Sequence, residues 1–130
     1  MGLAARASRR PNSGRRVTAA MLEQQRLKLA YLAARLGGVQ ASSIYSYQDR
    51  EHSQMSGSGG EYFDYRRGER FSESEDHATG ARWTIEVKGA EFSGYNFGTK
   101  EHFTGTIDAA GLVRFHDYGT GEWYDYAAQG

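Results

Sequence analysis

Hydrophobic residues recur with the period of a helix near the start of the chain. From about Val17 to Leu36 the residues Ala, Leu, Gln, Lys, Arg and Met dominate, and these side chains lose little conformational entropy in a helix. Gly37 and Gly38 follow and supply a stop signal. The pattern therefore predicts a helix over residues 17–37.

Two apolar stripes lie on opposite sides of this predicted helix, although a helix packed on one sheet needs only one apolar face. The second stripe is either covered by the aliphatic stems of neighbouring Arg and Lys side chains, or it is a second burial surface for self-association or a partner. The first stripe consists of Leu22, Leu29, Leu32 and Leu36, and the second of Leu27 and Tyr31. These six residues are the candidate interface.

The pattern changes after Gly38. Every aromatic residue except Tyr31 lies between Tyr45 and Tyr126, in short runs separated by Gly, Ser, Asp and Asn. Two stretches rich in Gly, Ser and acids, 53–60 and 68–80, are predicted to be mobile loops. The predicted strands are Ile44–Gln48, Tyr62–Arg66, Arg82–Lys88, Phe92–Phe97, His102–Ile107, Leu112–Asp117 and Glu122–Ala127.

Alternation with a period of two assigns the side chains of these strands to two faces. Trp83, Ile85 and Val87 share an apolar face, and the opposite face is polar and aromatic. The pattern predicts an α+β fold, in which an N-terminal amphipathic helix packs on, or plugs, a curved antiparallel β meander or small barrel of five to seven strands. Residues 17–130 would form this single domain, with its β region over 44–127.

The polar face of the last two predicted strands holds the candidate ligand-binding residues. An Arg supplies a planar fork for carboxylate or phosphate, Trp and Tyr supply stacking area, and His beside Asp could move a proton. The alternative is a solvated face of cross-strand pairs, including Arg114 with Asp125. The candidate residues are Arg114, His116, Tyr118, Trp123 and Asp125.

Charge is unevenly distributed although the net charge is zero. Residues 1–37 hold eight Arg and Lys residues against the single acid Glu23, so residues 38–130 carry the balancing negative charge. Residues 1–16 are predicted to be a flexible basic arm, which either seeks an acidic partner or docks on its own acidic domain. Because the β region is acidic, nucleic acid is disfavoured as a partner.

The composition limits the expected cellular location of the protein and the kinds of chemistry it could perform. The chain has no Cys and no long apolar run, so we expect a cytoplasmic protein that does not span a membrane. It lacks HExxH, GxSxG and glycine-rich phosphate motifs, so we expect no metal and no cofactor, and the absence of catalytic motifs favours a protein that is not an enzyme. Three acid–His dipeptides do not change this view, because adjacent residues on a strand point to opposite faces. They are Glu51-His52, Asp76-His77 and Glu101-His102.

One short segment resembles a known family. The sequence Gly111-Leu112-Val113-Arg114-Phe115-His116-Asp117-Tyr118, preceded by the strand Phe103–Ile107, is similar to a closing hairpin of the cone-shaped α+β barrels in the NTF2-like superfamily. The resemblance implies a curved sheet with a ligand pocket or an active site, and it carries over no catalytic residue.

Three functions remain open from the sequence. The first is a non-enzymatic binding protein that captures a small molecule or a protein through the polar face. The second is a small enzyme or ligand carrier in which His116 acts with Asp125 or Glu86. The third is a structural protein that forms a homo-oligomer through the helix.

Overall fold

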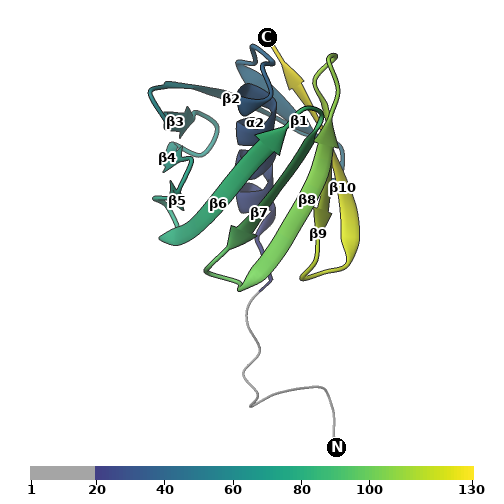
Figure 1. The fold of residues 1–130 in the computed structure, drawn as a ribbon. Coiled ribbons are helices and arrows are strands. Elements are labelled where there is room, and N and C mark those ends of the chain that lie inside the picture. Colours follow the sequence, from purple (N-terminus) through teal and green to yellow (C-terminus); the bar gives the residue numbers. More distant parts are fainter. Residues whose placement is uncertain (1–19) are drawn as a thin grey trace, which may run out of the picture.

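The computed structural model describes residues 20–130 and shows one helix enclosed by an antiparallel β-barrel (Figure 1). The helix, α2, spans Glu23–Leu36. Each strand pairs with its neighbours in the sequence, and β1 also pairs with β10, so the sheet closes. The strands are β1 (Ser43–Ser46), β2 (Glu51–Ser58), β3 (Glu61–Asp64), β4 (Glu69–Ser72), β5 (Glu75–Asp76), β6 (Ala81–Lys88), β7 (Glu91–Asn96), β8 (Glu101–Ile107), β9 (Leu112–Asp117) and β10 (Glu122–Gln129).

The predicted α+β fold with a barrel is confirmed, but the predicted number of strands is wrong, since the barrel has ten. Strands β2, β4 and β5 lie in or beside the segments 53–60 and 68–80, which the sequence pattern assigned to mobile loops. Their inward positions include Ser53, Gly57 and Asp76, so polar and small residues hide the alternation. Tyr62 packs directly over Gly57, where a side chain would collide with it.

The helix begins at Glu23 rather than at residue 17, and its two ends have local causes. At the start, the side-chain oxygen of Gln25 accepts a hydrogen bond of 3.0 Å from the Leu22 amide, which satisfies a donor that has no partner in the helix. At the end, Gly38 adopts a φ of 96°, and the chain leaves the helix there. Residues 17–19 and the predicted arm 1–16 lie outside the described residues.

The helix is buried on every side, which explains its two apolar stripes. All side chains from Gln25 to Ala34 are buried, and those from Leu29 to Ala34 have no exposed surface. A barrel of eight strands has just enough interior for its own side chains, so ten strands enclose a wider space. The small side chains of Ala30, Ala33 and Ala34 let the helix fit that space. Of the two predicted arrangements, packed on the sheet or plugging it, the structure has the plug.

Five of the turns share one design. In an up-and-down barrel the turns after β1, β3, β5, β7 and β9 lie at one end, and the helix starts at this end (Figure 1). Each of these turns begins with a buried polar residue and reaches a positive φ four residues later. The buried residues are Ser46, Asp64, Asp76, Asn96 and Asp117. The positive φ values are 55° at Arg50, 69° at Gly68, 76° at Gly80, 61° at Lys100 and 74° at Gly121.

The buried polar residue of each turn holds the turn closed. Asp117 Oδ1 accepts a hydrogen bond of 2.8 Å from the Gly119 amide, and Asn96 Oδ1 accepts one of the same length from Gly98. Asp64 accepts from two amides of its turn. This is the usual way in which Asp and Asn stabilise turns. Asp64 also pairs with Arg67 of its own turn, whereas the fully buried carboxylates of Asp76 and Asp117 need a cation from elsewhere in the chain.

Two cations of the helix neutralise these buried carboxylates. Lys28 Nζ lies 2.8 Å from Asp76 Oδ1 and 2.7 Å from Glu69 Oε1, and Arg26 Nη1 lies 3.1 Å from Asp117 Oδ2. The side chains of Lys28, Asp76 and Asp117 have no exposed surface. A buried ion that loses its partner is costly, so the helix and the turns depend on each other.

Tyr126 adds a second polar contact between the helix and the barrel wall. Its hydroxyl donates to the carboxylate of Glu23, whose two oxygens both lie at 3.0 Å. Burial, reinforced by the negative charge of Glu23, raises the pKa of Tyr126 far above its ordinary value. This phenol therefore stays protonated while the protein is folded.

We expect a chain that begins at Val39 to lose the folded barrel. Without the helix, the inward aromatic side chains surround an empty space, and Asp76 and Asp117 lose their cations. Circular dichroism should show no cooperative thermal transition, whereas a chain that begins at Ala20 keeps every contact described above and should retain it. A cooperative, monomeric barrel from the shorter chain would contradict this role of the helix.

The ion pair of Lys28 and Asp76 can be tested with a double-mutant cycle. Asp76→Asn keeps the turn design, because Asn96 occupies the same place in the β7–β8 turn, but it leaves the buried Lys28 with Glu69 alone. We expect a loss of about 3 kcal/mol in the free energy of unfolding. Adding Lys28→Met removes the buried cation, which has lost its only fully buried partner, and should recover most of that loss in chemical denaturation. A double variant no more stable than Asp76→Asn would disprove the coupling.

Alkaline pH should destabilise the protein through its buried tyrosines. Because the folded-state pKa of Tyr126 is raised, its contribution to stability is complete below the unfolded pKa of about 10 and declines as the pH rises above it. Each such tyrosine lowers the free energy of unfolding by about 1.4 kcal/mol per pH unit in that range. Denaturation between pH 9 and 11.5 should show a shallower decline for Tyr126→Phe. Equal slopes would mean that Tyr126 ionises in the folded state.

Candidate functional site

The outer face of β6–β10 carries two parallel rows of polar side chains, each of which crosses five strands. We call the first the hydroxyl row, because Ser and Thr occupy its middle, and the second the charged row. Their members follow from the pairing of the strands, since directly opposed residues share a face. The hydroxyl row is Glu86, Ser93, Thr104, His116 and Trp123, and the charged row is Lys88, Glu91, Thr106, Arg114 and Asp125.

All five ligand-binding candidates from the sequence lie on this outer face, as the alternation predicted. Arg114 pairs with Asp125 across β9 and β10, with Nε 3.1 Å from Oδ1, and more than half of each side chain is exposed. The Arg114 guanidinium also lies 5.0 Å from the centre of the Trp123 ring. The solvated Arg114–Asp125 pair that the sequence offered as the alternative is thus present, and its guanidinium also packs over the indole of Trp123.

His116 is part of an aromatic cluster and not of an acid–base pair. Its ring centre lies 4.5 Å from that of Tyr118 and 4.7 Å from that of Trp123. Across the strands it faces Thr104 and Trp123, while the neighbouring Asp125 is engaged by Arg114. The arrangement suits stacking and hydrogen bonding with a ligand.

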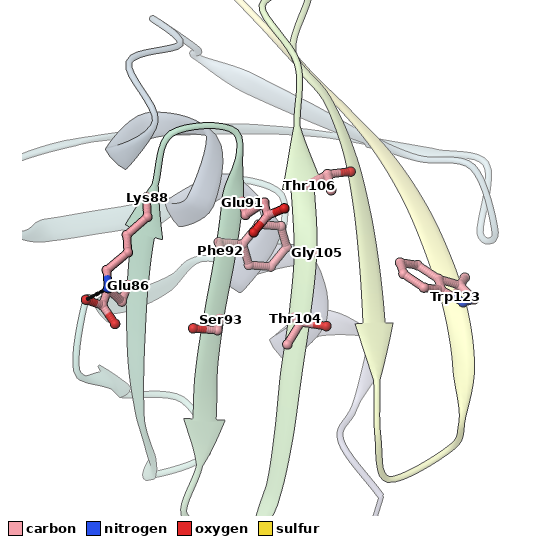
Figure 2. Close-up of a pocket in the computed structure, with 9 residues that line it drawn as sticks. All are labelled: Glu86, Lys88, Glu91, Phe92, Ser93, Thr104, Gly105, Thr106 and Trp123. Atoms are coloured by element: carbon pink, nitrogen blue, oxygen red, sulfur yellow. Dashed lines mark ion pairs between the residues drawn. The ribbon is translucent and has the colours of Figure 1, made fainter.

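A groove of about 390 Å³ lies between the ends of the two rows (Figure 2). Its middle is formed by the short side chains of Ser93, Thr104 and Thr106 on β7 and β8. Glu86, Lys88 and Glu91 stand at one side, where Lys88 Nζ lies 3.8 Å from a Glu86 oxygen. Trp123 stands at the other side, on β10, as Figure 2 shows. The groove exists because short side chains lie between long ones.

Two glycines on the inner side allow the strands beneath the groove to lie close to the core. Phe92 packs over Gly105, and Phe103 packs over Gly94, so a side chain at either glycine would collide with an aromatic ring. Phe92, Phe103 and Phe115 then form a continuous aromatic cluster under the sheet, with ring centres 5.1 to 6.4 Å apart. The groove therefore rests on a rigid support.

A second groove of about 420 Å³ lies on the other side of the Arg114–Asp125 pair, and it is more apolar. Tyr47, Leu112 and the two members of the pair contribute to its lining. Tyr47 and Leu112 are about half exposed. The ion pair thus forms a ridge between two hollows on the same face of the barrel.

The β9–β10 hairpin has the outward aromatic–His pair that the β1–β2 and β7–β8 hairpins also have, but in the reverse order along the chain. In β1, β3 and β7 the residue directly before the buried polar residue of the turn is an outward aromatic one, namely Tyr45, Phe63 and Tyr95. In β9 the same position is His116. In the strand after the turn, the corresponding outward residues are His52, Arg70, Arg82 and His102, whereas β10 has Trp123. The other tryptophan, Trp83, is buried and donates a hydrogen bond to the carbonyl of Ser72. Trp123 is the exposed one.

Sequence reasoning missed that Ser93, Thr104, Thr106 and Glu91 form one site with Trp123. The alternation did place Thr104 and Thr106 on the polar face, but only the pairing register of β6–β10 brings them into line with Trp123. The five-fold recurrence of the turn design was a signal in the sequence that could have fixed this register.

Of the candidate interface residues, Leu27, Leu29, Tyr31 and Leu32 are at most 1% exposed, because they contact the barrel of the same chain. Leu22 and Leu36 lie near the ends of the helix and are 49% and 39% exposed. Only these two positions of the set present substantial surface to solvent.

Within residues 20–130, no group of three or more His, Cys, Asp or Glu side chains is placed to hold a metal ion. Among the same residues, no helix is both long and apolar enough to cross a membrane. The chain matches no known protein family, no curated protein and no solved structure.

Proposed function

We propose that the protein is a non-enzymatic binding protein whose recognition surface is the outer face of β6–β10. The observation that carries this proposal is the position of Trp123. Trp123 is 52% exposed, lines a groove, and packs against Arg114 and His116. Large exposed aromatic side chains with a fixed orientation are typical of binding hot spots.

The filled interior of the barrel favours a binding site on the outer surface. In barrels that carry ligands, the ligand occupies the space enclosed by the strands. Here α2 occupies that space, and its residues from Leu29 to Ala34 have no exposed surface. A ligand carrier that uses the interior would have to expel the helix, together with the buried Lys28.

The chemistry of the outer face favours binding over catalysis. His116 stacks with aromatic rings, and Asp125 is neutralised by Arg114. An acid–base mechanism needs a base within hydrogen-bond reach of a group that orients it. Stacking area, hydroxyl groups and charges of both signs are instead the components of a recognition surface.

A fragment screen by NMR tests this proposal across many chemical classes of ligand at once. We expect a library of small polar and aromatic molecules to shift amide signals of β6–β10 more than those of any other surface. Trp123→Ala should weaken these hits by roughly tenfold, because it removes the stacking surface.

Tyr65→Ala is the matched control, since Tyr65 is 57% exposed and follows β3 outside the site. The fragments found in the screen should bind Tyr65→Ala with unchanged affinity. Hits that cluster on another surface, or that bind Trp123→Ala unchanged, would overturn the proposal.

A further inference from the structure

We infer that the ligand of the groove is an uncharged saccharide, with a pyranose ring packed against Trp123 and its hydroxyl groups bound by the hydroxyl row. This inference rests on the proposed function and names the ligand class of that site. It is argued from the shape of the groove, the groups that line it, their charges and the closure of the barrel.

The first argument is the combination of one aromatic wall with a polar floor. A pyranose has an apolar face of C–H groups and a rim of hydroxyl groups, so it needs an aromatic surface on one side and hydrogen-bonding groups around it. Trp123 supplies the first, and Ser93, Thr104 and Thr106 lie across the floor beside it. A flat aromatic ligand would use the indole but would leave this floor unpaired.

The second argument is the match between hydrogen-bonding groups. A sugar hydroxyl both donates and accepts, as do the hydroxyls of Ser and Thr. The carboxylates of Glu86 and Glu91 each present two acceptor oxygens, which suits a pair of neighbouring sugar hydroxyls, and Lys88 supplies donors. The groove therefore offers partners for a ring of hydroxyl groups without requiring charge on the ligand.

The third argument is the near balance of charge. The two rows hold Lys88 and Arg114 against Glu86, Glu91 and Asp125, and two of these acids are engaged by the two cations. Such a surface attracts neither phosphate groups nor strongly cationic ligands.

The fourth argument is that no strand from β7 to β10 offers a free edge, because each of them pairs with a strand on both sides. Extended peptides commonly bind by adding a strand to the exposed edge of a sheet. Here β1 pairs with both β2 and β10, so the circle of strands is complete. A peptide would be left with side-chain contacts alone, which disfavours it relative to a saccharide.

Size and preorganisation are consistent with a short oligosaccharide. The volume of about 390 Å³ lies in the range of small-ligand sites. Strands are about 4.8 Å apart, so β7 to β10 span roughly 14 Å. Because Arg114 and His116 already hold the indole, stacking costs little side-chain entropy. The groove is open to solvent, so we expect dissociation constants on the order of 1 mM.

The experiment titrates the full chain with cellotriose, N,N′,N″-triacetylchitotriose and maltotriose, and with the blocked cationic tripeptide acetyl-Gly-Lys-Gly-amide. Amide signals are followed by NMR. A change in indole fluorescence on binding reports Trp123, because Trp83 is buried and out of contact with a ligand on the outer face. For at least one trisaccharide, the binding curve should saturate. That trisaccharide should shift the amide signals of β7, β8 and β10 and change the indole fluorescence. Trp123→Ala should weaken the affinity for this trisaccharide at least tenfold, and Trp123→Phe should weaken it less. Tyr65→Ala should leave the affinity unchanged. Trp123 is on the surface, so amide spectra should confirm that these variants fold.

The outcomes separate this inference from the proposed function. If the tripeptide saturates at the same signals and the saccharides do not, the saccharide inference is wrong while the binding surface stands. If a saccharide binds elsewhere and is insensitive to Trp123→Ala, the inference is wrong. If neither class of probe shifts the groove and the fragment screen also avoids it, both proposals fail.

Discussion

The structure depends on the neutralisation of buried carboxylates by the helix that the barrel encloses. Asp117 closes its turn with Oδ1 and meets Arg26 with Oδ2, whereas Oδ1 of Asp76 both accepts from a turn amide and meets Lys28. Each of these carboxylates serves both the local turn and the packing of the whole molecule. Because an uncompensated charge in such an interior is strongly unfavourable, the barrel and helix are stable only together.

This dependence explains the composition of the helix. A helix on the surface of a sheet has one apolar face, whereas α2 is enclosed by strands on all sides and needs apolar or neutralised side chains around its whole circumference. Ala30, Ala33 and Ala34 keep it narrow, and Leu29, Tyr31 and Leu32 fill the remaining space. Arg26 and Lys28 can be buried there because each forms an ion pair with a buried carboxylate.

A filled interior also determines where recognition can occur. The outer face is the surface that remains, and three of the five hairpins that meet at the helix start pair an outward aromatic ring with a His or Arg on the next strand. The β9–β10 hairpin differs, since His116 and Trp123 occupy the corresponding positions and stand beside the groove over β7 and β8. The repeat accounts for a His beside an aromatic ring at this place, and the feature that our proposed function uses is that in β9–β10 the ring is the exposed Trp123 beside a groove.

The sequence by itself determined the helix, the curved antiparallel sheet and the two faces of the strands from β6 to β10, because these follow from local periodicity. It also determined that Arg114, His116, Tyr118, Trp123 and Asp125 share the outer face, since alternation along a strand does not depend on the neighbouring strands. Only the tertiary structure decided the rest. Closure with ten strands depends on β2, β4 and β5, whose inward positions are partly polar or glycine, and the burial of Lys28 depends on Asp76, which is distant in the sequence. The groove depends on register between strands, a long-range property that no local pattern contains.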